Sequence, residues 1–422
     1  MNTNHFFLHL KSTIQTAELL VNTHTQSIVP KGQQGLKLDV MVNQSVIRFD
    51  SKGIPPSIWK NIQTDTKCTL TYNIPVSNEL IRRPVSFVIA VQDACSVAVV
   101  QEINQYVRQS LTWLYIAQKN AKKNQCNTAP LIVYLLFSPL LKMLPIKGTK
   151  GTALPVIDWV NANTAFTMVC QDLGRGVSQG QSGAKSRGAS NPKVREIVIY
   201  RKEEWFKVFI HETFHNYGFD FSNASDDLIQ YGTSFVLNKL YPVKSDVNLY
   251  EAYTECWARI IYVAFSCMHT GNDDAFLACM KRRLDEEIAF SFFQAAKVLE
   301  YMNIESYEQL VRGQCQAEYK ENTSILAYYV ITLVLFANYP AFIAWCYQHN
   351  RITTTSSSLQ FHLSDYIVFK QTRANLESFC TALLQKQYQA SNLVQKINHH
   401  LADIRTKKRK TALYKTLRMT SK

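Results

Sequence analysis

The pentapeptide His211-Glu212-Thr213-Phe214-His215 constrains the fold of this chain more than any other feature. Histidines at positions i and i+4 lie one above the other on a helix, so their imidazoles can share one metal ion. Neutral imidazole nitrogens bind zinc at about 2.0–2.1 Å, and a glutamate beside them can take a proton from a zinc-bound water. The pattern therefore predicts a buried helix, one zinc ion bound by His211 and His215, and Glu212 as general base.

Residues on both sides of the pentapeptide favour such a helix. Glu203 and Glu204 would lie in its first turn, where the helix dipole stabilises acidic side chains. Gly218 offers a residue at which the helix can end. The buried face would consist of apolar side chains, namely Phe206, Phe209, Ile210 and Phe214.

A catalytic zinc site has three protein ligands and one open position, so a third ligand is needed. Residue 221 is Phe, which excludes the spacing HExxHxxGxxH with a third histidine. Glu251 lies 36 residues after His215, far enough for a loop and a returning helix, and Glu255 follows one turn later. Glu251 is the candidate third ligand, and Glu255 could accept the other ring N–H of a ligand histidine. An ordinary acidic helix face is the alternative for this pair.

The motif His211-Glu212-x-x-His215 followed by Glu251-x-x-x-Glu255 resembles the gluzincin group of metallopeptidases, which includes thermolysin and the anthrax lethal factor. In these families the first acid of the second motif is a zinc ligand and the second acid supports a histidine. The resemblance implies these roles for Glu251 and Glu255. It also implies a zincin-like lobe whose edge strand, here residues 196–200, lies antiparallel to a bound peptide.

Residues 196–215 are also similar to uncharacterised zinc peptidases predicted in nucleocytoplasmic large DNA viruses. This similarity covers mainly residues 160–270. It implies a viral protein, with viral structural proteins as candidate partners, and it says nothing about the substrate.

Neither motif assigns the donor that would stabilise the oxyanion of a tetrahedral intermediate. Five tyrosines are candidates, and each could equally be packing material: Tyr217, Tyr253, Tyr250, Tyr328 and Tyr329. Three further histidines have no ligand spacing and are expected to be structural: His269, His349 and His362.

Hydrophobic periodicity predicts an α+β fold, in which strands and helices are followed by a mainly α-helical C-lobe. The resemblance implies that the part before this C-lobe is a zincin-like mixed-sheet N-lobe that carries the active-site helix. Strands are expected at 36–49, 68–74, 85–91, 131–137, 164–170 and 196–200, and an amphipathic helix at 97–118. We expect a strand-rich N-terminal part (1–82), the zincin N-lobe with the HExxH helix (83–220), a helical C-lobe that supplies the third ligand (221–400) and a basic tail (401–422).

The stretch Leu173 to Pro192 contains five glycines and four serines and is poor in apolar residues. It predicts a flexible loop that could cover the peptide-binding cleft.

The stretch Thr323 to Gln348 has no charged residue and is long enough to span a membrane. Pro340 would break it into two shorter helices. Two packed core helices are therefore preferred over a transmembrane span.

The composition is that of a globular protein, with 46% hydrophobic and 18% charged residues. The ten cysteines form no CxxC pair, and the first dozen residues are too polar for a signal peptide. These features predict reduced thiols and a cytoplasmic protein that is not secreted. If the protein is viral, the cytoplasm is that of the infected host cell, and packaging in the virion is an option.

Much of the net charge of +14 is local, because eight Lys or Arg and no acid follow residue 404. Such a tail could contact nucleic acid or an anionic surface, or it could simply be solvated.

The leading prediction of function is zinc-dependent hydrolysis of peptide bonds in a peptide or protein substrate. The alternative is a virion structural or scaffold protein that keeps a zincin fold with little or no catalysis. A third option, a nucleic-acid-binding protein, rests only on the tail.

Overall fold

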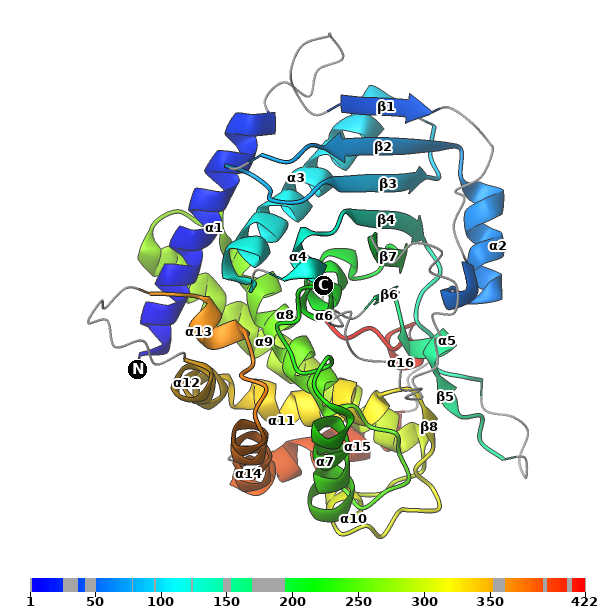
Figure 1. The fold of residues 1–422 in the computed structure, drawn as a ribbon. Coiled ribbons are helices and arrows are strands. Elements are labelled where there is room, and N and C mark those ends of the chain that lie inside the picture. Colours follow the sequence, from blue (N-terminus) through cyan, green and yellow to red (C-terminus); the bar gives the residue numbers. More distant parts are fainter. Residues whose placement is uncertain are drawn as a thin grey trace.

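The computed structural model describes residues 2–25, 37–41, 51–77, 79–94, 96–122, 124–146, 153–168, 194–351, 361–389, 393–407 and 412–421. Figure 1 shows a sheet at one end of the molecule and a mass of helices at the other. The fold is mixed α/β with a mainly helical C-terminal half, as expected at this coarse level.

The strands are β1 (Lys37–Met41), β2 (Cys68–Ile74), β3 (Val85–Val91), β4 (Leu131–Ser138), β5 (Ile157–Asp158), β6 (Ala165–Thr167), β7 (Arg195–Arg201) and β8 (Glu321–Asn322). The helices up to the HExxH segment are α1 (Thr3–Thr25), η1 (Ser51–Gly53), α2 (Pro56–Asp65), α3 (Val97–Asn120), α4 (Gln125–Thr128), α5 (Trp159–Ala162) and α6 (Trp205–Tyr217). The later helices are α7 (Asp226–Phe235), η2 (Val236–Leu240), α8 (Leu249–Cys267), α9 (Asp273–Tyr301), α10 (Tyr307–Val311), η3 (Leu326–Ile331), α11 (Thr332–Ala337), α12 (Tyr339–Asn350), α13 (Ser364–Ile367), α14 (Arg373–Gln389), α15 (Leu393–Lys407) and α16 (Ala412–Lys415).

In the described part of the chain, six strands form one mixed sheet in the order β1-β2-β3-β4-β7-β6. The strands β3, β4 and β7 are parallel, whereas β1, β2 and β6 run antiparallel to their neighbours. Alternate side chains face opposite sides. On β7, Ile197 and Ile199 join the main core with α3 and α6, while Val198 and Tyr200 pack against α2.

The prediction that residues 196–200 form the edge strand is wrong. The strand β7 lies between β4 and β6, and Ala165–Thr167 pairs antiparallel with residues 197–199. Side chains on both faces of β7 are buried, as is usual for a central strand. In the described part of the chain, β6 is the edge strand on this side of the sheet and β1 lies at the opposite edge.

Four other predicted elements are confirmed, namely the strands at 68–74, 85–91 and 131–137 and the helix at 97–118. The strand expected at 164–170 is shorter, since β6 covers residues 165–167. The strand expected at 36–49 is described only at β1. The glycine-rich stretch 173–192 lies outside the described residues.

The first 25 residues differ from the prediction of a strand-rich N-terminal part, because residues 3–25 form the helix α1. Its buried side chains include Phe6, Leu10 and Ile14, at the spacing of one helix face. The Phe6 ring packs against Trp257 and Tyr366, at centroid distances of 5.7 and 4.8 Å. Residues 37–41 and 68–74 do form strands, but they pair into the same sheet as β3 across the expected boundary at residue 82.

The tail expected at 401–422 is not an exposed extension in the part that the structure describes. Helix α15 continues to Lys407 and packs on α9. Farther along, Leu417, Met419 and Thr420 are buried, and the chain passes through the middle of the molecule in Figure 1. Apolar and hydroxyl side chains alternate with the basic ones here, and they supply a buried face that a count of charges overlooks.

The charge-free stretch 323–348 forms η3, α11 and α12, with a break before Pro340 as predicted. Most residues of η3 and α11 are buried in the main core. Among the described residues, no single helix has the length and apolarity to cross a membrane. The pair Leu326–Ala337 and Tyr339–Asn350, bent by 89°, meets those two criteria only when taken together.

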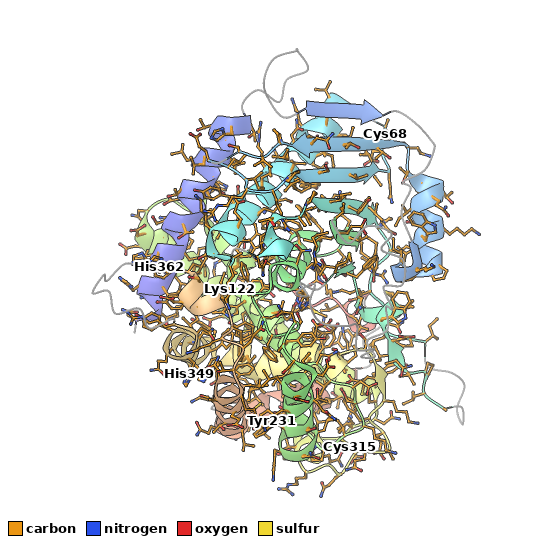
Figure 2. All side chains as sticks on the ribbon, viewed as in Figure 1. Cys68, Lys122, Tyr231, Cys315, His349 and His362 are labelled. Carbon is orange, nitrogen blue, oxygen red and sulfur yellow. A yellow bond between two sulfur atoms is a disulfide. The ribbon has the colours of Figure 1, made fainter. Side chains whose placement is uncertain are left out.

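The expectation of reduced thiols is wrong for Cys267 and Cys279, which form a disulfide between the end of α8 and the start of α9. Cys68 is also disulfide-bonded. By contrast, Cys315 is a buried free thiol at the opposite end of the molecule from Cys68 (Figure 2).

Candidate metal centre

The helix α6 carries both histidines of the pentapeptide and is buried along its whole length after the first residue. Glu204 precedes it with a φ of 59°, a left-handed conformation that costs a non-glycine residue about 1–3 kcal/mol. Gly218 ends it with a φ of 67°, where its N–H reaches the carbonyl of His215 at 3.2 Å. The predicted helix and its end are therefore confirmed. The prediction that Glu203 and Glu204 lie in its first turn is wrong, because the helix begins at Trp205 and both acids precede it.

The helix α8 packs against α6 and brings Glu251 and Glu255 to the two histidines. The Nε2 atoms of His211 and His215 are 3.1 Å apart. An Oε2 atom of Glu251 lies 3.0 Å from the first and 3.3 Å from the second. These three residues form a group that could hold a metal ion, which the structure brings together as the sequence predicted.

The three atoms, two ring nitrogens and one carboxylate oxygen, all lie within 3.3 Å of one another. Lone-pair donors at such distances repel one another unless protons or a cation lie between them. His211 and His215 are each 6% exposed, so bulk water screens this repulsion only weakly. A proton or a bound cation among the three atoms would relieve this repulsion.

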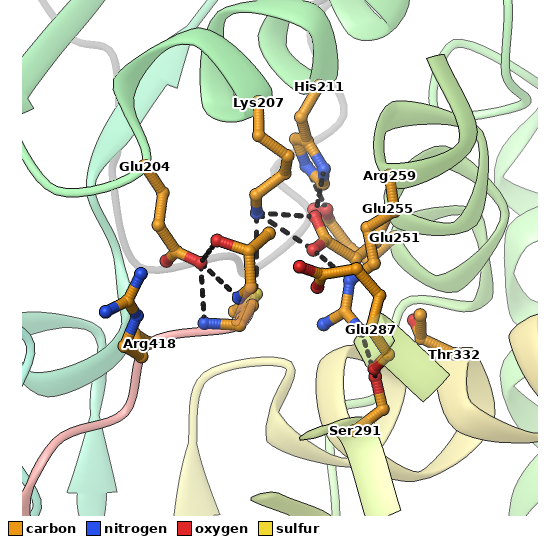
Figure 3. A network of polar contacts seen from close by, with 12 residues as sticks. Glu204, Lys207, His211, Glu251, Glu255, Arg259, Glu287, Ser291, Thr332 and Arg418 are labelled. Carbon is orange, nitrogen blue, oxygen red and sulfur yellow. Dashed lines mark hydrogen bonds and ion pairs between the residues drawn. The ribbon is translucent and has the colours of Figure 1, made fainter. Parts of the chain in front are cut away.

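The opposite ring nitrogens are held by carboxylates. His211 Nδ1 lies 3.1 Å from Glu255 Oε2, the supporting contact expected of Glu255 (Figure 3). His215 Nδ1 donates to Asp220, which also accepts hydrogen bonds from Thr254 Oγ1 at 2.9 Å and Ser222 N at 3.0 Å. With N–H groups at Nδ1, both rings present their Nε2 lone pairs to Glu251.

Asp220 is the residue of the site that sequence reasoning missed. Gly218 reverses the chain at the end of α6, and this turn returns Asp220 to the ring of His215. The sequence did offer a signal for this contact. Asp220 is an acid five residues after the second histidine and just beyond the predicted helix end.

Electrostatics in the group favour a bound cation. Burial opposes the charged form of each group, yet the neighbouring imidazoles hold the pKa of Glu251 far below its usual value. Burial likewise works against protonation of the histidines. Contacts with Glu251 and Glu255 nevertheless raise the pKa of His211, and Asp220 and Glu251 raise the pKa of His215. A divalent cation would satisfy the same carboxylates that attract these protons.

Glu212, the predicted general base, is 8% exposed and lies within electrostatic range of His211 and His215. Burial is the largest influence and raises the pKa of its carboxyl group. Within the described residues its carboxylate makes no hydrogen bond or ion pair. It is thus available to a water molecule or a substrate.

Three of the five candidate tyrosines make their contacts away from the metal-binding group. Tyr253 donates to the carbonyls of Tyr366 and Ile367, both at 3.1 Å, and Tyr217 lies beneath the guanidinium of Arg83 at 4.2 Å. Neither contacts the metal-binding group. The Tyr329 hydroxyl donates to the carbonyl of residue 417 in the core.

Two tyrosines do lie beside the group. The ring centroid of Tyr328 is 6.1 Å from that of His211, and Tyr250 is 5.8 Å from His215. Tyr328 belongs to the π-helix η3, a type of helix found frequently at functional sites. Burial and the nearby carboxylates, with Glu251 first, raise the pKa of Tyr328 well above its usual value, so its hydroxyl keeps its proton.

The lone histidines are apart from the centre, as predicted. His349 stacks on Trp345 at 4.7 Å in the helical half, and Figure 2 shows His362 near the surface at α13. His269 is exposed.

No family model matches this chain, and comparisons with curated proteins and with solved structures give no match. Any assignment of function therefore rests on the geometry and chemistry of the metal-binding group.

Proposed function

We propose that the chain is a zinc-dependent peptidase of the gluzincin type, with one Zn²⁺ held by His211, His215 and Glu251. The observation that carries the proposal is the spacing of their three donor atoms, 3.0, 3.1 and 3.3 Å. Tetrahedral zinc with bonds of about 2.0–2.1 Å separates its ligand atoms by about 3.3 Å. Two imidazoles and one carboxylate are also a known ligand set of catalytic zinc, which leaves one position open.

Bound zinc would supply a Lewis acid and lower the pKa of a water at the open position. Glu212 would take the proton of this water as general base and pass it to the leaving amine. Its unpaired carboxylate and its place between the two ligand histidines support this role.

A donor is also needed for the negative charge that develops on the carbonyl oxygen. Tyr328 supports this part of the proposal best, because it lies against His211 and keeps a protonated hydroxyl. Tyr217 and Tyr253, the two candidates set first by the sequence, lie in contacts elsewhere.

The edge strand β6 is the proposed docking site for the substrate backbone. Thr167 accepts a hydrogen bond from Asn216 at 3.2 Å, so β6 runs alongside the helix that carries His215. In the described part of the chain no strand pairs with the outer side of β6. An extended peptide could add there as a further strand, as in other cases of strand addition.

The test is zinc content together with cleavage of a mixed peptide pool, for the wild type, Glu212→Gln and the control Glu79→Gln. We expect one zinc per chain in all three and loss of cleavage only in Glu212→Gln. Equal cleavage by wild type and Glu212→Gln would exclude this mechanism. A wild type that binds no zinc would exclude the site, and one that binds zinc but cleaves nothing would favour the scaffold alternative.

A further inference from the structure

The segment 416–421, far from the ligands in sequence, is built into the interior. Leu417 N donates to the carbonyl of Lys142 at 2.9 Å, and Gln294 donates to the carbonyl of Arg418 at 2.7 Å. Met419 N donates to Glu204 at 2.8 Å, and Ser421 N to Glu287 at 2.9 Å. Its backbone groups are thus paired with side chains and carbonyls of several elements, which is the mark of a packed structural segment.

Glu204 connects this segment with the first turn of α6. Its buried carboxylate accepts hydrogen bonds from Met419 N and from Thr420 Oγ1, the latter at 2.7 Å, and pairs with Lys142. Burial opposes ionisation, but Lys142 and Lys207 outweigh it and hold the pKa of Glu204 at about 2. These partners can hold the ionised Glu204 in the left-handed conformation from which α6 starts.

Lys207 lies one turn further along α6, between the segment and the metal centre (Figure 3). Its ammonium contacts Met419 Sδ at 3.7 Å and both oxygens of Glu255, at 2.8 and 3.0 Å. Its side chain is only 2% exposed, so these protein groups rather than water surround the charge.

Glu255 completes the connection. Arg259 pairs with its Oε1 at 2.9 Å, so Glu255 would keep a cationic partner even if Lys207 were replaced. Of these two cations, Lys207 also contacts Oε2, the oxygen that faces His211 Nδ1 at 3.1 Å. The particular contribution of Lys207 is therefore the orientation of the carboxylate toward the histidine.

We propose that Lys207 and the segment 416–421 together position His211 for metal binding. The segment holds the start of α6 through Glu204 and covers Lys207, and Lys207 holds the Glu255 carboxylate against His211. This inference rests on the proposed metal site and goes beyond it, because it assigns a role to residues that contact neither metal nor substrate.

The test is the zinc dissociation constant, measured by competition with a chromophoric chelator, beside the urea-unfolding midpoint of the metal-free protein. Lys207→Met keeps the aliphatic stem but loses the charge, and Lys207→Arg restores a donor. Thr420→Val exchanges the hydroxyl for a methyl group of similar size. Matched controls are Lys202→Met, an exposed lysine, and Thr406→Val, an exposed threonine on α15.

We expect Lys207→Met to weaken zinc binding about tenfold or more, in the range seen for outer partners of ligand histidines. Lys207→Arg should recover part of this loss, Thr420→Val should weaken binding several-fold, and the controls should not change it. If Lys207→Met fails to fold, Thr420→Val alone decides. Zinc affinity within twofold of wild type in the folded variants, with only the unfolding midpoint lowered, would overturn the inference. A wild type that binds no zinc overturns the proposed function as well.

Discussion

Asp220 accepts a hydrogen bond from Nδ1 of His215, on the side of the ring that faces away from Glu251. Glu255 makes the matching contact with Nδ1 of His211. Each of the two candidate ligand histidines thus has its own carboxylate, one from the turn after α6 and one from α8. Such partners fix the tautomer and raise the basicity of the nitrogen that binds the metal.

Replacing Asp220 with Asn should weaken zinc binding by about 10–100-fold, because the amide lacks the charge that favours the Nδ1–H tautomer. The measurement is a zinc dissociation constant by chelator competition. Asp227→Asn, an exposed substitution on α7, is the control. Wild-type affinity in Asp220→Asn would show that the contact does not support the ligand.

Removal of zinc should destabilise the fold, since a ligand bound only to the native state stabilises it by mass action. With free zinc at 100 times its dissociation constant, the free energy of unfolding should rise by about 2.7 kcal/mol over the chelator-treated protein. Glu251→Ala loses the third ligand and should show little of this difference. Urea titrations with and without zinc measure this difference in the free energy of unfolding. An equal increase in Glu251→Ala would show that Glu251 is not a zinc ligand.

Tyr328→Phe should lower kcat by about 10²–10³ while zinc affinity stays unchanged, if this hydroxyl stabilises the oxyanion. Tyr253→Phe is the comparison, because its hydroxyl bonds two buried carbonyls away from the centre. That change should leave kcat unaltered and cost about 1–3 kcal/mol of stability. The opposite pattern would reverse the assignment.

The carboxyl group of Glu321 should make stability depend on pH. Burial raises its pKa to about 7, while its hydrogen bonds with Ser245, Tyr319 and Leu326 N work in the other direction. The folded form therefore binds this proton more tightly than the unfolded form. The stabilisation is fully present below about pH 4.5 and is lost as the pH rises through 7.

Glu321→Gln should remove this dependence, which amounts to a change on the order of 2–3 kcal/mol between pH 4.5 and 7.5. The measurement is the free energy of unfolding of both proteins across that range. Parallel curves for wild type and variant would show that Glu321 ionises normally in the folded protein.

The elements predicted correctly are those determined by residues close together in the sequence. The helix around His211 was predicted from residue spacing and from its end at Gly218, and β3 and β4 from continuous apolar runs. The pairing of Glu251 with these histidines came from a motif spacing whose meaning rests on resemblance. All of these features require few distant contacts.

The missed features depend on contacts between residues far apart. Glu196 to Tyr200 reads equally as an edge or a central strand until β6 is placed beside it. The burial of Met419 and Thr420 depends on Glu204 and Lys207, which lie more than 200 residues earlier in the sequence. Neither hydrophobic spacing nor a charge count contains that information.

The contact between Thr420 and Glu204 also bears on biosynthesis, because 216 residues separate the two partners. At about 5–20 residues per second, the helix with both histidines is synthesised roughly 10–40 s before the residues that hold its first turn. During that interval a nascent chain already contains His211 and His215, the two candidate metal ligands of α6, without the full support of that helix. The contacts of Thr420 with Glu204 can therefore form only after α6 has been synthesised.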